Sequence, residues 1–497
     1  MRTITKALLS AALLGSALSL RAGDPWLNVF YTSNSDFVQR DMQELNAINV
    51  TGDALQLVGS DGTLTTLSCK SIDHWTVGDG SISLYITTDD GITEVTSKTV
   101  YTDGTLYRQG VGIVDDIEDA TMKIRGRGNT TWSYTKKPYR LKFDKKTNLG
   151  DDQFHKAKNW VLLANYLDPS LMRTEAAFIF GQLIDMPYIN HCLPVNVYLN
   201  NNYKGAYTLT EKVGINNGSI RDIEDETNSV LYKLDTYDAD ADEHGFDSTY
   251  YRLPVRIKDP DAPEDDYEAL AAWEQERQDA FTTFEKAVYS GDESTIFEAC
   301  DHESLVRFVM TFNLACNQEI DHPKSIYMYK RELDGKMYFG PCWDFDWAYG
   351  YQPTYSKGSS SSSSGGWGGG WNGGGPGGWG GWDNTTTTSY ETYENPLIGT
   401  GKNEGYGGEL FKALCNNDTF LKRYAEIWND FYQNHLDEFW EMFDAYADAA
   451  ETSANLNGTI YSSARQFRTD VQTLRNWISN RIEYINDPDN NYGLWED

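Results

Sequence analysis

Two aspartates, Asp344 and Asp346, alternate with aromatic residues in the segment Trp343-Asp344-Phe345-Asp346-Trp347. In an extended segment, residues two apart point to the same side, so both carboxylates would face one site. Two like charges held together favour a bound cation, and carboxylate oxygens suit Mg²⁺ or Mn²⁺. The flanking tryptophans favour a buried segment over a turn with solvated aspartates, which is the alternative. We therefore predict a divalent-metal site at these two aspartates.

Lys142 and Glu175 are candidates for an ion pair that positions a phosphate-binding lysine. Lys142 lies on the charged face of a predicted strand, where an ammonium could contact nucleotide phosphates. Glu175 lies on the apolar stripe of a helix predicted over 171–185, and a carboxylate that faces a core needs a cationic partner. The alternatives are an exposed lysine and a salt bridge from Glu175 to Arg173 or Arg125.

A basic, glycine-containing segment over 123–132 places Arg125 and Arg127 beside Gly126 and Gly128. Such glycines let backbone N–H groups approach an anion, and the arginines would add positive charge. A hairpin turn with solvated arginines would give the same pattern. Taken alone, this segment is a weak indication of an anion site.

The elements that would position these residues form a β-rich part followed by a helical part. Residues 23–110 alternate short β-like runs with turn residues and are predicted as a β-rich N-terminal region. A strand is predicted over 137–143, with Tyr139, Leu141 and Phe143 on one face. Further along the chain we predict a hairpin over 195–209 and helices over 264–290, 303–316, 418–452 and 462–485. The fold class is therefore α+β.

Residues 357–388 form a low-complexity insertion with a serine run followed by glycine-rich sequence that carries four tryptophans. Ordering such a chain costs much entropy, so we predict a mobile loop. Stacking of its tryptophans on sugars is an alternative that would give the protein a glycan contact.

Composition and charge bound the partners of this 497-residue chain. Its 42 Lys and Arg face 74 Asp and Glu, and the net charge of −32 disfavours nucleic acid as a partner. Hydrophobic residues make up 40% and aromatic residues 13%, which is too much for a disordered chain. Most of the chain is therefore expected to fold.

Residues 1–22 have the basic start, short apolar run and small residues of a secretory signal peptide. No other stretch approaches the ~20 apolar residues of a membrane helix, so none is predicted. The mature protein is expected to be secreted or held at the cell surface.

The order of seven segments resembles the CotH (spore coat protein H) family of atypical protein kinases. These segments are RGRGNTTW, KKPYRLKF, NWVLLANYLDPSLMRTEAAF, YKGAYTLTEKV, a helix ending near Asp321, YMYK and PCWDFDWAYG. The resemblance covers roughly residues 111–350, with helices to about 485, and we predict a CotH kinase-like domain over 111–490.

The resemblance implies a diverged protein-kinase-like fold that uses ATP with Mg²⁺ or Mn²⁺ and phosphorylates a hydroxyl of a protein acceptor, here an exported one. It places Lys142 at the phosphate-contacting lysine and Glu175 at its helical partner. Asp344 and Asp346 fall in the metal-binding segment. Asp321 falls where the family carries its catalytic aspartate.

The chain departs from the family pattern after Asp321. The family carries an Asn about five residues further on, whereas residues 322–326 contain none, and Glu319 is a competing catalytic candidate. Loss of an amide ligand weakens metal binding, so an inactive CotH-like binding or scaffold protein at the cell surface is an alternative. A glycan-associated adhesion protein is a second alternative.

Overall fold

The computed structural model describes the chain in segments that include most of the predicted domain. These are residues 26–31, 37–41, 44–78, 81–109, 117–128, 130–150, 154–221, 223–235, 244–263, 266–320, 323–350, 392–395, 397–398, 408–461 and 466–487. The predicted signal peptide over 1–22, Asp321 and the insertion over 357–388 lie outside the described residues.

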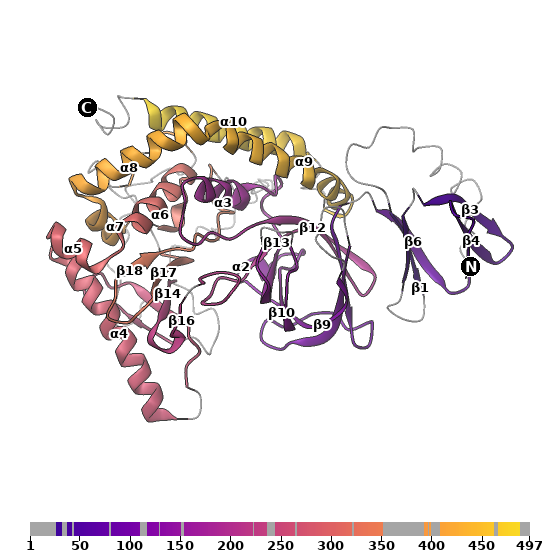
Figure 1. Ribbon diagram of the computed structural model, residues 1–497, viewed down its shortest axis with the longest axis horizontal. Coiled ribbons are helices and arrows are strands. Elements are labelled where there is room, and N and C mark those ends of the chain that lie inside the picture. Colours follow the sequence, from indigo (N-terminus) through magenta and orange to yellow (C-terminus); the bar gives the residue numbers. More distant parts are fainter. Residues whose placement is uncertain are drawn as a thin grey trace, which may run out of the picture.

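A closed seven-stranded barrel forms the first large unit (Figure 1). In spatial order its strands are β10 (Tyr139–Thr147), β11 (Ala157–Leu163), β13 (Asn202–Glu211), β12 (Leu193–Leu199), β7 (Ser83–Thr88), β8 (Thr102–Gln109) and β9 (Ile117–Gly126). Along β10, Tyr139, Leu141 and Phe143 are buried in the barrel core, which confirms the predicted strand and its apolar face. Alternation of side chains on the strand places the charged residues outside.

The hairpin of β12 and β13 confirms the one predicted over 195–209. Asn200 and Asn201 have φ angles of 49° and 63°, so both adopt the left-handed conformation that a tight hairpin turn of this kind requires. Asparagine tolerates this conformation better than most residues.

The boundary that we predicted at residue 110 falls inside the barrel. Strands β7 and β8 precede it, and β7 pairs in parallel with β12 while β8 pairs with β9. The strands before β7 form two three-stranded sheets of their own, with a small shared core. These strands are β1 (Trp26–Tyr31), β2 (Phe37–Asp41), β3 (Leu45–Thr51), β4 (Ala54–Gly59), β5 (Leu64–Ser68) and β6 (Ile72–Gly78).

The second large unit combines a five-stranded sheet with helices (Figure 1). Its strands, in spatial order, are β15 (Gly245–Asp247), β16 (Pro254–Asp259), β14 (Val230–Leu234), β17 (Ile326–Lys330) and β18 (Met337–Phe339). Its helices are α4 (Tyr267–Tyr289), α5 (Glu293–Ala299), α6 (His302–Ala315), α7 (Gly408–Cys415), α8 (Asp418–Asp430), α9 (Leu436–Ile460) and α10 (Phe467–Asn486), and a π-helical turn (Phe431–His435) joins α8 to α9. The four predicted helical regions are thus confirmed, and one large apolar core joins this sheet to the helices.

Helix α3 (Arg173–Leu183) begins two residues later than the helix that we predicted over 171–185. Leu171 has a φ of 56°, so the chain cannot be helical there. The Asp168 carboxylate accepts hydrogen bonds from the backbone N–H groups of Ser170 and Arg173. This aspartate therefore fixes the turn that leads into the helix.

The chain is a mixed α/β protein with a β-rich N-terminal region and a helical C-terminal part. This agrees with the predicted α+β class. Among the described helices, none combines the length and apolar composition needed to cross a membrane.

Candidate active site

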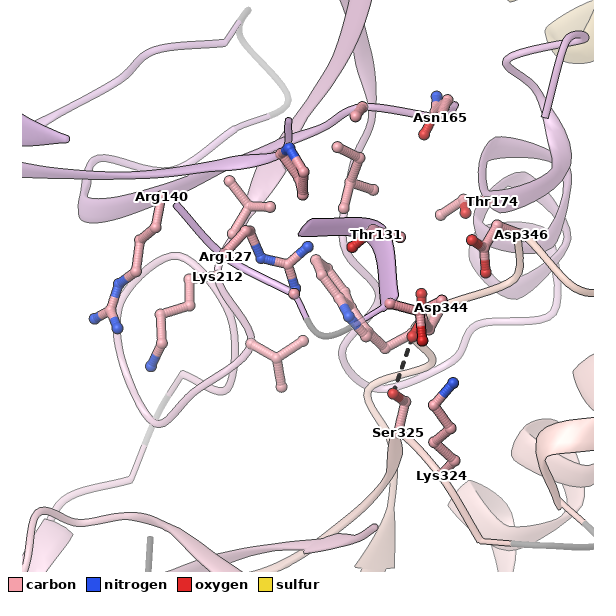
Figure 2. Close-up of a pocket in the computed structure, with 18 of the residues that line it drawn as sticks. Arg127, Thr131, Arg140, Asn165, Thr174, Lys212, Lys324, Ser325, Asp344 and Asp346 are labelled. Atoms are coloured by element: carbon pink, nitrogen blue, oxygen red, sulfur yellow. Dashed lines mark hydrogen bonds between the residues drawn. The ribbon is translucent and has the colours of Figure 1, made fainter. Parts of the chain in front are cut away.

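A cleft lies where the barrel meets the five-stranded sheet (Figure 2). Arg140 of β10 lines it from the barrel side, and Lys233 of β14 and Tyr327 of β17 line it from the sheet side. The loop 127–138, which joins β9 to β10, and the loop 343–347 complete the lining. Both large units therefore contribute to one site.

The cleft is strongly basic although the protein as a whole is acidic. Its lining contains eight basic and three acidic residues, whereas the whole chain has a net charge of −32. The basic residues are Lys98, Arg125, Arg127, Arg140, Lys212, Lys233, Lys258 and Lys324, and the acidic ones are Asp235, Asp344 and Asp346. A cleft lined mainly by one sign of charge concentrates ligands of the opposite sign, so this cleft is suited to an anion.

Both aspartates of the aromatic segment, Asp344 and Asp346, line the cleft. The segment is a turn rather than the extended stretch that we expected, because Asp344 has a φ of 68°. Burial and the neighbouring Asp344 carboxylate raise the pKa of Asp346 to about 8. The two carboxylates are thus close enough to interact. The left-handed backbone at Asp344 brings them together, and not the alternation of an extended strand.

Two side chains hold Asp344 in this conformation. Ser325 donates a hydrogen bond from Oγ to Asp344 Oδ2 at 3.0 Å, and Asn317 donates from Nδ2 to the Asp344 carbonyl at 3.2 Å. Ser325 itself has a φ of 56°. Left-handed residues persist where the surroundings fix them, and here the hydrogen bond from Ser325 to Asp344 joins two of them.

Arg173, at the start of α3, holds the chain that follows Asp346. Its Nη1 donates to the carbonyls of Ala348 and Tyr349, the latter at 3.0 Å, and its Nε lies 3.5 Å from Asp168 Oδ1. Arg173 was one of the alternative partners for Glu175, but it forms its ion pair with Asp168. Arg173 therefore connects the first turn of α3 to the end of the loop 343–347, here called the acidic loop.

Lys324 projects into the cleft from a buried ion pair with Glu319. Its Nζ lies 3.2 Å from Glu319 Oε1 and 5.1 Å from the ring centroid of Trp347. Burial opposes the charge, but Glu319, Asp344 and Asp346 together raise the pKa of Lys324. Glu319 is only 2% exposed and does not line the cleft, so it positions Lys324 from the protein interior.

The predicted glycine-containing segment lies over the cleft. Arg125, Arg127 and Gly128 all belong to the lining, and the guanidinium carbon of Arg127 is 5.5 Å from the ring centroid of Trp343. Burial lowers the pKa of Arg127, while Asp344 acts in the opposite direction. Gly128 has a φ of 78°, and a Cβ there would lie 2.2 Å from Thr131 Oγ1, so this position requires glycine.

Lys142 does not reach the cleft. It is exposed on β10, opposite Asn159 of β11 and Lys123 of β9, and it is not part of the lining. Arg140 lies two residues earlier on the same face of the strand and does line the cleft. Two residues along a strand correspond to about 6.6 Å, which is enough to move a side chain out of the site.

Glu175 is also separated from Lys142. Its carboxylate accepts a hydrogen bond from the Cys192 thiol, whose pKa is raised by burial and by Glu175, and it acts electrostatically on Tyr446 of α9. No ion pair joins Glu175 to Lys142 in the part of the chain that the structure describes. The structure therefore places Arg125, Arg127, Asp344 and Asp346 in the lining of one cleft and leaves Lys142 and Glu175 outside that lining.

Sequence reasoning missed several polar residues of the cleft, among them Arg140, Lys212, Lys324 and Ser325. Lys324 and Ser325 lie in the stretch 322–326, which departs from the family pattern and therefore gave no signal for a cleft residue. Lys212 directly follows β13 in the segment YKGAYTLTEKV, where nothing in the local pattern distinguishes it from a solvated lysine.

The donor set suits a hard divalent cation that arrives with a phosphate ligand. Among the described residues, no three His, Cys, Asp or Glu side chains lie close enough to hold a metal ion by themselves. Asp344 and Asp346 supply two carboxylates, and the Ser325 hydroxyl adjoins one of them. Mg²⁺ is commonly bound through one or two carboxylates plus substrate phosphates and water, so these residues fit a metal–nucleotide complex.

Fold and site together define a mixed α/β protein with a basic cleft between two units and a carboxylate pair in that cleft. A family model described as CotH kinase protein matches residues 124–485. The match covers most of the chain, and the protein belongs to the CotH family. A comparison with curated proteins gave no match.

Proposed function

We propose that this protein is an exported phosphotransferase that moves the γ-phosphoryl group of ATP to a hydroxyl of a protein acceptor, with Mg²⁺ or Mn²⁺. The observation that carries this proposal is the meeting of Asp344, Asp346, Arg127 and Lys324 in one cleft. Carboxylates for a metal and fixed cations for phosphates are the parts that phosphoryl transfer requires, because catalysis there is mostly positioning and charge neutralisation.

Each residue has a distinct role in this proposal. Asp344 and Asp346 would hold the divalent ion, which when bound neutralises charge on the phosphates. Arg127 and Lys324 donate hydrogen bonds to phosphate oxygens. Their cation–π contacts with Trp343 and Trp347 orient the two side chains toward the ligand. Glu319 and Arg173 position Lys324 and the acidic loop, respectively.

The transfer step forms a bond between the acceptor oxygen and the γ-phosphorus while the bond from that phosphorus to the β–γ bridging oxygen breaks, and ADP leaves. The proton of the acceptor hydroxyl passes to a carboxylate. Following the family pattern, we assign that carboxylate to Asp321, which precedes the Lys324 segment in the chain. Glu319 is less suited to this role because it is buried away from the cleft lining.

A diverged protein-kinase-like fold is part of the same proposal. It is supported by the division into a β-barrel unit and a sheet-and-helix unit with the candidate site between them (Figure 1). Export is supported by the signal pattern over 1–22. Detection of the mature chain, cleaved near residue 22, in the medium or at the cell surface would test the export.

Transfer of label from γ-labelled ATP tests the function. The unmodified protein, with Mg²⁺ or Mn²⁺, is expected to label itself or co-secreted proteins, and Asp344→Asn is expected to abolish this labelling. Calorimetry of ATP binding with metal and with EDTA provides a second readout. Metal-dependent ATP binding without any transfer would favour the inactive binding protein, and ATP binding that is equal in EDTA would contradict the assigned role of the two aspartates.

A further inference from the structure

Three basic side chains form a group at the side of the cleft away from the carboxylates, here called the basic wall: Arg125 of β9, Arg140 of β10 and Lys212 after β13. Figure 2 shows Arg140 and Lys212 on one side and Asp344 and Asp346 on the other, with Arg127 between them. All three members of the wall come from the barrel unit, so one rigid element presents them.

The basic wall has few partners of its own. Arg140 donates to Asn159 Oδ1 at 3.0 Å and Arg125 donates to the Lys98 carbonyl, yet the Nε atoms of both arginines are buried without a hydrogen-bond partner among the described residues. No ion pair involves any of the three within the part of the chain described. Cations that line a cleft without an ion pair attract anions, so the wall is suited to an added anion.

The charges around the wall are separate from those around the carboxylates. After burial, Lys212 is affected most by Asp259, Arg140 and Lys258, and the pKa of Lys212 is lowered to about 8. Lys324 is affected by Glu319, Asp344 and Asp346 instead. After burial, Arg127 is affected by Asp344 and also by Arg125, which places it at the junction of the two regions.

The positive charge at the wall exceeds that of the carboxylates beside it. Arg125, Arg140 and Lys212, with the adjoining Lys258, supply four positive charges. Asp259 and Asp261, the two carboxylates that act on Lys212, offset two of them. Two positive charges therefore remain at the wall, apart from those of Arg127 and Lys324 beside Asp344 and Asp346.

We propose that the basic wall is a second anion-binding subsite that selects acceptor segments carrying acidic residues near the phosphorylated hydroxyl. This inference rests on the proposed function, since it names the acceptor that the transferase would use. Acceptor carboxylates accept hydrogen bonds from Arg125, Arg140 and Lys212, while the hydroxyl reaches the phosphate at Asp344 and Asp346. The acidic remainder of the protein surface repels such an acceptor elsewhere, so recognition depends on this patch.

Peptide binding measured by fluorescence anisotropy tests the wall without requiring catalysis. The probe is a labelled peptide in which one serine is flanked by glutamates, added to the whole protein with ADP and Mg²⁺. Matched peptides carry glutamines or lysines in place of the glutamates. We expect the glutamate peptide to bind at least ten-fold more tightly than either of the others, with an affinity that falls as salt is raised.

Variants locate the binding. Arg140→Gln and Lys212→Met are expected to weaken the glutamate peptide about ten-fold each and to leave ATP affinity unchanged. Lys142→Met is the matched control, because Lys142 lies two residues from Arg140 on the same strand face but outside the cleft. Loss of ATP affinity in both wall variants, or equal binding of the three peptides, would overturn the proposal. Peptide binding without phosphoryl transfer would retain the subsite and reject the proposed activity.

Discussion

Lys136 is buried against Tyr461, with its Nζ 5.5 Å from the centroid of that ring and 4.8 Å from the centroid of Tyr207. Nζ also donates a hydrogen bond to the Ala206 carbonyl, and the residue is 2% exposed. Lys136 belongs to the loop 127–138 over the cleft, whereas Tyr461 directly follows α9. The C-terminal helices are thereby connected to the loop that carries Arg127.

The buried Lys136 makes stability depend on pH. Burial lowers the pKa of Lys136 to about 7, whereas an unfolded lysine titrates near 10.5. Between these values the unfolded chain binds one proton more than the folded chain, so the free energy of unfolding rises with pH across this window. As pH falls toward 7, protonation of the unfolded chain lowers the free energy of unfolding. In Lys136→Met, calorimetry is expected to show a smaller increase in Tm from pH 7 to pH 9 than in the unmodified protein.

Lys137→Met is the control for this measurement. Lys137 is half-buried and donates to the Trp132 carbonyl at 2.6 Å, so it belongs to the same loop without the same burial. The Tm of Lys137→Met is expected to change with pH as that of the unmodified protein does. An unchanged pH dependence in Lys136→Met would mean that Lys136 is protonated in the folded state.

Glu319→Gln and Asp321→Asn are expected to have different defects. Removing the Glu319 charge leaves Lys324 without its 3.2 Å partner, so ATP affinity should fall about ten-fold. Asp321→Asn should abolish transfer while ATP affinity is retained, because a proton-accepting residue acts in the transition state. Calorimetry measures the ATP affinity of each variant, and transfer of label from γ-labelled ATP measures its activity. The two measurements together distinguish the two defects. If Glu319→Gln keeps its ATP affinity and loses only transfer, Glu319 is the catalytic residue.

Arg173→Met tests the support of the acidic loop. Arg173 donates to two carbonyls beyond Asp346, and loss of these partly buried hydrogen bonds should cost about 1–3 kcal/mol of stability. Metal-dependent ATP binding should weaken about ten-fold because the carboxylate is no longer held. Arg423→Met is the control: Arg423 pairs with Glu303 at an exposed site, where such pairs contribute about 0–1 kcal/mol. Equal losses in the two variants would contradict the positioning role.

Gly128→Ala tests the close packing of the loop over the cleft. The left-handed backbone alone should cost an alanine about 1–2 kcal/mol, and the 2.2 Å approach of a Cβ to Thr131 Oγ1 should add to this. Gly62→Ala isolates the first effect, since Gly62 has a φ of 84° with nothing within 4 Å of its Cβ position. Urea unfolding should show the larger loss for Gly128→Ala, and only that variant should also bind ATP more weakly.

Local patterns predicted much of the fold because they reflect local causes. The alternating residues of β10, the paired asparagines before β13 and the apolar periodicity of the helices each determine structure within a few residues. The aspartates at 344 and 346 were also identified, since buried tryptophans beside acidic residues are unusual on a solvated surface.

Positions that depend on distant partners could not be predicted in the same way. Alternation shows that Arg140 and Lys142 share a face, but which of them reaches the cleft depends on where distant parts of the chain meet β10. The apolar stripe of α3 predicts that Glu175 faces inward, yet its neighbours Cys192 and Tyr446 come from other parts of the chain. Pairing between β7 and β12 likewise leaves no local signal at residue 110.

The parallel pairing of β7 with β12 determines where the chain can be cut. The family match begins at residue 124, inside β9, so a fragment with those limits would lack β7, β8 and most of β9. The barrel would then open into a sheet with exposed N–H and C=O groups on β10 and β12, and such unprotected edges recruit strands from other molecules. Expression of the matched region alone is therefore expected to give oligomers that associate through these edges, and strands β7, β8 and β9 are all needed to close the barrel.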